Sequence, residues 1–208
     1  MRKAVLVFVL LLIVAVAGCI GGSPQTQSSS STGPTTTPAT SKTLSPWKAD
    51  GVIGENEYPH SLTLAGGKFE VYWRNDGEYL YMALKGETKG WVAIGFEPSY
   101  AMKDADMIIG WVQDGRVFIV DAYSTGAYGP HPPDTKLGGT DDILEKAGRE
   151  EGGYTVIEFK RKLNTGDKYD KVLTPGKEVN FIFAMADTDE FTAKHNIAKG
   201  SGKLKLDG

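Results

Sequence analysis

Two Asp-Gly pairs, at positions 76–77 and 114–115, constrain the fold of this chain more than any other feature. Each pair separates two runs in which apolar and polar residues alternate. Alternation with a period of two is typical of half-buried strands, and Asp-Gly between two such runs is a strong signal for a β-hairpin. The sequence therefore predicts one hairpin from 68–74 and 78–85, and a second from 107–113 and 116–123.

Further strand-like runs occupy much of the remaining sequence. Residues 91–96 (WVAIGF) and 107–112 (MIIGWV) are almost entirely apolar, which is typical of central strands buried on both faces. Other expected strands are 154–160, 178–186 and 202–206. No long segment has the periodicity of a helix. We therefore predict an all-β domain, a two-sheet antiparallel β-sandwich of immunoglobulin-like architecture.

The chain opens with MRKAVLVFVLLLIVAVAGC. Arg2 and Lys3 precede an apolar stretch over 4–17, which is the pattern of an export signal. This stretch is shorter than the roughly 20 apolar residues of a spanning helix, so a transmembrane anchor is the weaker interpretation. The residues VAGC resemble a lipobox, in which the Cys19 thiol becomes lipid-modified. We expect a signal peptide over 1–18 and a lipoprotein held through Cys19 at the extracytoplasmic face of the cell membrane.

Residues 20–46 are rich in Ser, Thr, Pro and Gly and nearly uncharged. Such a segment cannot bury enough apolar surface to offset its ordering entropy. We interpret 19–43 as a lipid-anchored linker and 44–208 as one folded domain of ordinary size. Cys19 is the only cysteine, so an intramolecular disulfide and a cysteine-ligated metal are both excluded.

The charge of the chain argues against a nucleic-acid partner. The formal charge is -3, and removal of 1–18 would take away Arg2 and Lys3 and bring it to -5. The sequence also has no basic cluster. Because phosphate binding needs clustered Lys and Arg, we expect no binding to nucleic acid.

Familiar catalytic motifs are absent from the sequence, which contains no G-x-S-x-G, no H-E-x-x-H and no P-loop. Asp141 with Asp142, or Asp187 with Asp189 and Glu190, could bind a hard cation. Neither group has the full pattern of a calcium loop, and loop carboxylates more often face solvent or cap turns. We therefore expect no catalytic residue, and an electron-transfer or ligand-binding domain in place of an enzyme.

Three long connections interrupt the strands, at 97–106, 124–141 and 187–201. Long loops in a compact domain often carry function. Met102 lies in the first of them and His195 in the third. A Met sulfur and a His nitrogen are a known axial pair for haem iron. Taken alone, however, a loop His more often faces solvent and a loop Met more often closes the end of a core.

A thioether is a weak ligand, so a Met-ligated haem needs a rigid apolar pocket. Phe96, Tyr100 and Trp73 are close to Met102 in the sequence or on a neighbouring expected strand, and we expect them to contribute to the pocket. Lys194 is adjacent to His195, where its charge can balance a haem propionate. These residues, with Met102 and His195, form the predicted cofactor site.

The order of the motifs GWVAIGF, M-x-DADMIIGWV, DGRVFIVDAY, YTVIEFKRKLNTGD and H…GKLKL resembles the DOMON domain family over about 68–206. Its haem-binding members, such as the cytochrome domain of cellobiose dehydrogenase, imply a β-sandwich that holds one b-type haem. The resemblance implies Met102 and His195 as the axial ligands, Met107 as a core residue and His131 as a weaker substitute. The implied role is one-electron transfer to a redox partner protein or an extracellular acceptor.

A second interpretation is a non-catalytic module of the same fold that binds a carbohydrate or another small ligand without haem. The stretch WKADGVIGENEY, at 47–58, is similar to the start of some carbohydrate-binding modules. Trp47, Trp73, Trp91 and Tyr128 offer candidate stacking faces for a sugar. A structural or adhesive surface protein is a third possibility that fits the same linker.

Overall fold

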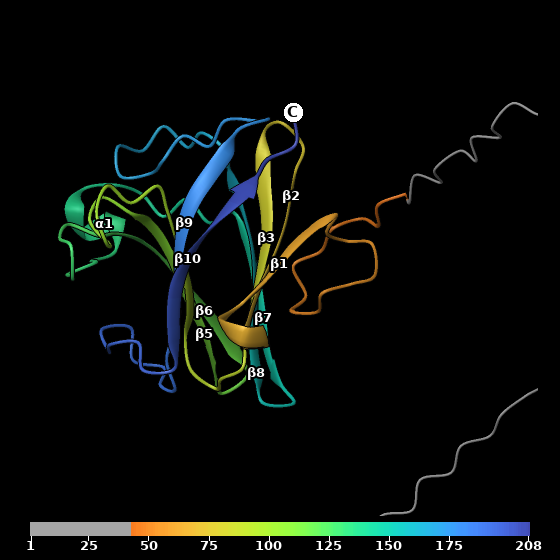
Figure 1. Cartoon of the computed structure of the whole chain (residues 1–208), viewed down its shortest axis with the longest axis horizontal. Helices are drawn as coiled ribbons and strands as arrows, with labels where there is room; N and C mark the ends of the chain where they lie inside the picture. Colours follow the sequence, from red (N-terminus) through yellow and green to blue (C-terminus); the bar gives the residue numbers. More distant parts are fainter. Residues whose placement is uncertain (1–42) are drawn as a thin grey trace, which may run out of the picture. The chain divides into compact units, whose positions relative to one another are not determined.

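The computed structural model of the protein describes residues 43–208. They form two five-stranded antiparallel sheets packed face to face (Figure 1). This confirms the predicted all-β sandwich. The expected signal peptide, the lipidation site at Cys19 and almost all of the linker lie outside the described residues. No helix in the described part of the chain is long and apolar enough to cross a membrane.

The first sheet has the order β1–β2–β3–β8–β7 and the second the order β10–β9–β4–β5–β6. The strands of the first sheet are β1 (His60–Leu64), β2 (Phe69–Asn75), β3 (Tyr79–Gly86), β7 (Glu145–Glu151) and β8 (Tyr154–Lys162). Those of the second are β4 (Val92–Phe96), β5 (Asp106–Gln113), β6 (Arg116–Tyr123), β9 (Glu178–Met185) and β10 (Ala198–Lys205). A 3-10 turn, η1 (Ala65–Gly67), and a short helix, α1 (Asp134–Leu137), complete the described elements.

Both predicted hairpins are present. β2 pairs with β3 and β5 pairs with β6, each across the Asp-Gly turn expected from the sequence. At the second turn Asp114 and Gly115 both have positive φ, as a tight hairpin requires. β4 lies between β9 and β5, which confirms it as a central strand.

Two edge strands of the first sheet, β1 and β7, do not appear among the predicted strands. β7 exposes most of its residues on both faces, so its sequence EKAGREE carries no alternation. β10 also begins earlier than predicted, at Ala198, with a run that contains Gly200 and Gly202. A Cβ at either glycine would lie 2.6 or 2.5 Å from a phenylalanine ring of β9, so close packing excludes a side chain there.

The main core lies between the two sheets. It is built from the inward side chains of both, including Phe69, Trp73, Phe96, Phe159 and Phe181. Full burial of a large apolar side chain stabilises the fold by about 1.5–3 kcal/mol. The ring of Phe69, on the first sheet, stacks on that of Phe183, on the second, with 4.8 Å between centroids.

Candidate functional site: the outer face of the second sheet

A second apolar cluster lies on the other side of the second sheet, facing away from the main core. We call it the outer patch. Its buried members are Trp91, Ala93, Ala105, Met107, Ile109, Ala122 and Ala186, and Met102, Trp111, Val120, Ile182, Ala184 and Phe191 pack against them. Three of its strand residues are alanines, Ala93, Ala122 and Ala184, and they lie among larger apolar side chains such as Met107, Ile109 and Trp111. The patch is therefore an apolar sheet face with small side chains at some positions.

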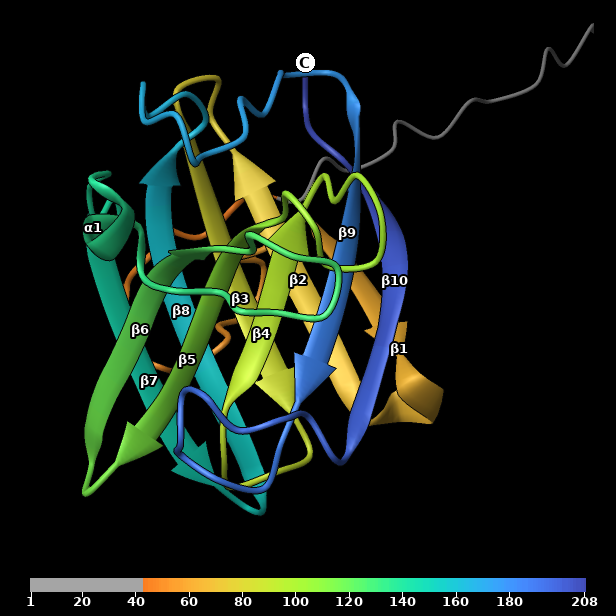
Figure 2. The same ribbon diagram turned by 90° about the vertical axis from the view of Figure 1, so that its left-hand side faces the viewer.

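Three loops cover the outer patch. They are the Met102 loop (97–105), the crossing loop (124–133) and the His195 loop (186–197). Because β4 and β9 are antiparallel, the Met102 loop and the His195 loop leave the second sheet at opposite ends. Figure 2 shows the crossing loop running in front of β5, β4 and β9, and the His195 loop rising over the same face from the far end.

Backbone hydrogen bonds fasten the Met102 loop to the crossing loop. The N–H of Met102 donates to the Ala127 carbonyl at 3.1 Å, and that of Asp104 donates to the Ser124 carbonyl at 2.9 Å. A further bond inside the loop, from Ala105 N–H to the Met102 carbonyl at 3.1 Å, tightens the turn. These bonds hold the half-buried Met102 side chain against the outer patch.

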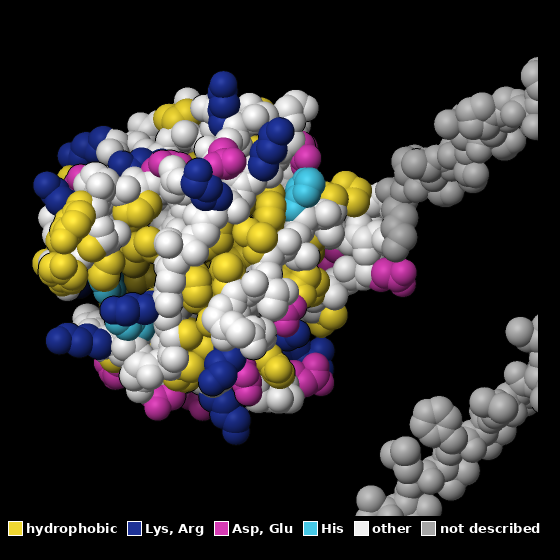
Figure 3. All heavy atoms as spheres, in the orientation of Figure 1, with side chains coloured by type: hydrophobic (Ala, Val, Ile, Leu, Met, Phe, Trp, Pro, Cys, Tyr) yellow, Lys and Arg dark blue, Asp and Glu magenta, His cyan; other side chains and the backbone are white. Residues whose placement is uncertain are grey.

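The His195 loop reaches the same patch through Phe191. The Phe191 ring lies 6.4 Å from the Trp111 ring, between centroids, and meets the His131 ring edge-on at 5.3 Å. His131 belongs to the crossing loop, so the loops from the two ends of the sheet meet here. In Figure 3 the left side of the molecule is hollowed between an upper group of apolar side chains and a lower group that includes histidine and lysine.

The two loop histidines are set up to be neutral. Burial, followed by the charges of Lys199 and Lys194, lowers the pKa of His195. Burial also lowers the pKa of His131, whose Nδ1 is buried and has no hydrogen-bond partner among the described residues. A neutral imidazole has a free lone pair and is the form that binds metals.

The structure separates the residues that the sequence predicted for the cofactor pocket. Met102 and the loop that carries His195 are at the outer patch. Tyr100 is 65% exposed and Lys194 is exposed, so both lie at the rim and neither forms an apolar wall.

The prediction for Phe96 and Trp73 was wrong. Both point into the main core between the sheets, on the side of the second sheet away from Met102. The physical reason is strand alternation: on β4, Phe96 shares the inward face with Ile94, while Ala93 faces the outer patch. Trp73 comes from the first sheet, and its indole N–H donates to the Lys205 carbonyl at 2.9 Å.

The donor set at the outer patch fits a haem. A haem needs an apolar face for its macrocycle and axial ligands for its iron, for which a thioether and an imidazole are suitable. The patch offers the Met102 thioether, and the loops over it carry the half-buried His195 ring and the unpartnered Nδ1 of His131. Sequence reasoning ranked His131 low; the burial of its ring nitrogen is a property that only the fold displays.

Comparison with known proteins identifies the same family that the sequence motifs resemble. The model of the DOMON domain matches residues 65–186, more than half of the sequence. The chain therefore belongs to the DOMON family. The matched region contains Met102 and His131, and His195 lies just beyond its end.

Among curated relatives, the chain is 36% identical over 166 residues to DBH-like monooxygenase protein 1 of Mus musculus, covering 78% of this chain and 26% of that protein. The Homo sapiens protein of the same name is 34% identical, with the same coverage. The chain thus spans about a quarter of the length of these relatives.

Two solved structures share the fold. The cytochrome b domain of pyranose dehydrogenase from Coprinopsis cinerea superposes with a TM-score of 0.53, at 14% identity, over 70% of this chain and 80% of that one. The cytochrome domain of Myriococcum thermophilum cellobiose dehydrogenase gives 0.50 at 14% identity, over 71% and 82%. At this identity the likeness concerns the fold alone.

Proposed function

We propose that this protein is an extracytoplasmic b-type cytochrome domain that carries single electrons and is anchored to the membrane by a lipid on Cys19. The observation that carries the proposal is the outer patch: an apolar sheet face covered by three loops, which carry Met102, His131 and His195 as potential iron ligands. The fold shared with two cytochrome domains supports it. In this proposal the chain is a redox carrier and not a complete enzyme.

Each residue has a defined part in the proposed site. Met102 and His195 would hold the haem iron, and haem b, when bound, would supply one-electron redox chemistry. The apolar side chains of the outer patch would exclude water from it. Phe191 positions the His195 loop through its contacts with Trp111 and His131. Lys194 lies at the exposed rim, where a cation can meet a propionate.

The test is to purify the full chain in detergent with haem supplied and to record reduced and oxidised absorption spectra. We expect one haem per chain and the spectrum of six-coordinate Met/His haem. Met102→Ala and His195→Ala should each abolish that spectrum. The matched control is His60→Ala, because His60 lies on the first sheet and its ring nitrogen is bonded to Asp207 at 2.8 Å. Absence of a Soret band from folded protein would refute the proposal.

The same experiment decides between the two loop histidines. If His131→Ala abolishes the low-spin spectrum while His195→Ala preserves it, His131 is the ligand and the assignment of His195 is wrong. If His195→Ala alone abolishes it, His131 serves the site through its contact with Phe191.

A ligand-binding module without haem is the second candidate, and one observation favours it. The outer face of the first sheet has a hollow of about 300 Å³ whose lining includes Tyr72, Lys85 and Tyr154. Trp73 and Trp91, in contrast, are buried and cannot stack on a sugar. Saturable binding in a glycan screen, lost in Tyr154→Ala and kept in Met102→Ala, would establish this function.

A further inference from the structure

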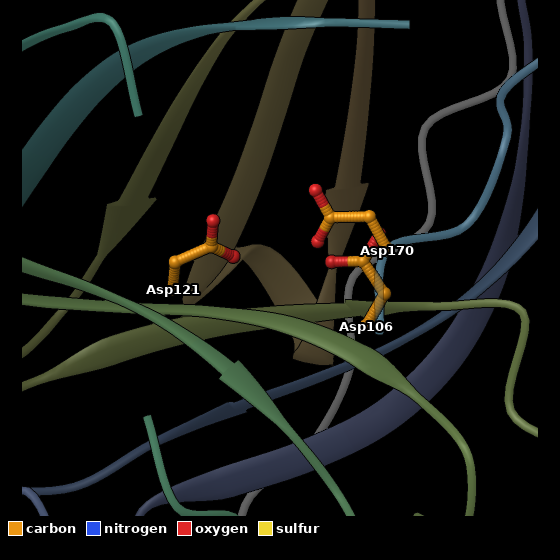
Figure 4. Close-up of side chains that lie close together, drawn as sticks. All are labelled: Asp106, Asp121 and Asp170. Atoms are coloured by element: carbon orange, nitrogen blue, oxygen red, sulfur yellow. The ribbon is translucent and has the colours of Figure 1, made fainter. Parts of the chain in front are cut away.

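Three carboxylates meet inside the sandwich, at the end where the connection between β8 and β9 crosses it (Figure 4). Asp106 begins β5, Asp121 lies on β6 and Asp170 lies in that connection. One oxygen atom of each lies within 4.8 Å of the others, and all three residues are buried. Buried carboxylates this close repel one another unless a positive charge lies between them.

Arg161, on β8, supplies part of that charge and is itself fully buried. Its Nη1 donates to both oxygens of Asp106, at 2.9 and 2.8 Å, and its Nη2 lies 3.3 Å from Asp170 Oδ2. Asp106 also accepts the N–H of Lys171 at 2.8 Å. Asp106 is therefore compensated, whereas neither oxygen of Asp170 has a hydrogen-bond partner among the described residues.

The independent sign of a missing ligand is Asp170, whose side chain is 2% exposed and whose two oxygens have no hydrogen-bond partner within residues 43–208. Asp134, the first residue of α1, is also buried with both oxygens unpartnered, but it does not belong to the group whose oxygens lie within 4.8 Å of one another. Asp121 keeps one bond, from the Asp142 N–H at 2.8 Å, and its Oδ1 is unpartnered.

The cluster thus sets three carboxylates against one guanidinium, an excess of two negative charges when all are ionised. Burying an uncompensated charge is strongly unfavourable, so the cluster must take up protons or a cation.

We propose that Asp106, Asp121 and Asp170 bind a hard divalent cation of the Ca²⁺ class, while Asp106 remains paired with Arg161. Ca²⁺ takes oxygen ligands at 2.3–2.6 Å, so two oxygens on one ion are separated by at most about 5 Å. The separation within 4.8 Å meets that limit. The ligand atoms are all carboxylate oxygens, the type that hard cations prefer.

The cation would fasten three separate parts of the fold to one another: β5, β6 and the connection after β8. Asp106 lies two residues beyond Asp104, which ties the Met102 loop to the crossing loop through the Ser124 carbonyl. Cation binding would therefore stiffen the base of the loop that carries Met102. The proposal holds independently of haem, because none of its ligands belongs to the outer patch.

The test uses the purified full chain, stripped of metal with a chelator and then titrated with CaCl₂ by calorimetry and by thermal unfolding. We expect one Ca²⁺ per chain and a Tm that rises with Ca²⁺ concentration. Asp170→Asn and Asp121→Asn should each weaken binding at least ~10-fold, because affinity follows the number of charged ligands. Asp114→Asn is the matched control: it removes the same charge at an exposed turn whose positive φ asparagine tolerates.

If Asp170→Asn fails to fold, Asp121→Asn alone tests the site, because Asp121 Oδ1 makes no hydrogen bond and an Asn oxygen can still accept the Asp142 N–H. Absence of saturable Ca²⁺ binding to the folded wild-type chain would overturn the proposal. Equal binding by the wild type and by the folded Asp121 and Asp170 variants would overturn it as well. A rise in Tm of metal-free Asp121→Asn without any Ca²⁺ binding would show that protons, and no cation, neutralise the cluster.

Discussion

The outer faces of the two sheets differ in polarity and in exposure to solvent. On the first sheet the outward residues of β2 are Glu70, Tyr72 and Arg74, which are polar and partly exposed. On the second sheet the outward residues of β4 and β5 include Ala93, Met107 and Ile109, which are apolar and buried beneath loops. An apolar sheet face buried under long loops forms a satellite cluster of the core, and such loops often carry function.

The interior shows the reverse contrast. Most of the space between the sheets is apolar, yet one end holds Arg161 and three aspartates, Asp106, Asp121 and Asp170. The second sheet therefore has apolar residues where solvent would favour polar ones, and acidic residues where the core would favour apolar ones. The apolar outer face and the buried acidic residues affect stability through different interactions. Separate substitutions can therefore test each of them.

The largest effect is expected for Arg161→Leu. Removal of one partner from a buried ion pair leaves an uncompensated charge, which typically lowers the free energy of unfolding by about 3–5 kcal/mol. Urea unfolding in the presence of a chelator measures it. The control is Arg149→Leu, which breaks the exposed pair with Glu151 and should change stability by less than about 1 kcal/mol. Equal effects of the two variants would show that Arg161 does not compensate the cluster.

Ile109→Asp tests the apolar character of the outer patch. It would bury an unpaired carboxylate under the covering loops and should destabilise the fold by about 3 kcal/mol. Val156→Asp makes the same kind of change at a half-buried outward position of the first sheet, where we expect about 1 kcal/mol or less. If urea unfolding gives the same loss for both variants, the two outer faces do not differ as described.

The central part of the fold could be predicted from the sequence because its strands carry strong patterns. The two apolar runs at 91–96 and 107–112 became β4 and β5, which are buried on both faces. The edge strands β1 and β7 escaped prediction for the opposite reason. A strand that packs on one side only, or on neither, needs few apolar residues, so its sequence resembles a loop.

Much less of the candidate site could be predicted. Met102 and His195 were predicted as ligands through loop position and resemblance, and that assignment stays a prediction. Whether their loops meet on one face depends on how three loops fold over one sheet. Phe96 and Trp73 were misplaced because closeness in sequence does not decide which side of a sheet a residue faces. The acidic cluster had one readable signal: in RVFIVDAY, alternation places Asp121 on the inward face with Ile119.

Phe191→Ala is expected to lower the free energy of unfolding by less than Arg161→Leu or Ile109→Asp. The substitution removes the aromatic contacts with Trp111 and His131 that hold the His195 loop over the outer patch. We expect a loss of about 1–2 kcal/mol and weaker haem retention. Phe118→Ala is the control: its ring also stacks on Trp111, at 5.4 Å, but it does not belong to the His195 loop. It should reduce stability and leave haem retention unchanged; equal haem loss would count against the role given to Phe191.

The smallest effect is expected on the polar outer face of the first sheet, with Glu70→Gln. Glu70 accepts hydrogen bonds from the Tyr72 hydroxyl and from Lys85 Nζ, the latter at 3.0 Å. Burial raises the pKa of Glu70, but the bonds from Tyr72 and Lys85 outweigh it and lower the pKa below 4.5. The ionised carboxylate therefore stabilises the folded state above pH 4.5, and this contribution is lost as the pH falls through the folded-state pKa.

Because Glu70 and Lys85 are partly exposed, water screens their attraction and the carboxylate contributes no more than about 1 kcal/mol. Urea unfolding at about pH 7 and about pH 3 should show the wild type more stable than Glu70→Gln at the higher pH and nearly equal to it at the lower. Exposed Glu87→Gln is the control and should show no such convergence. A stability gap that persists at low pH would mean that packing of the side chain, and not its charge, stabilises this face. The difference between the stability losses of Arg161→Leu and Glu70→Gln would then depend on side-chain packing as well as on burial of the charge.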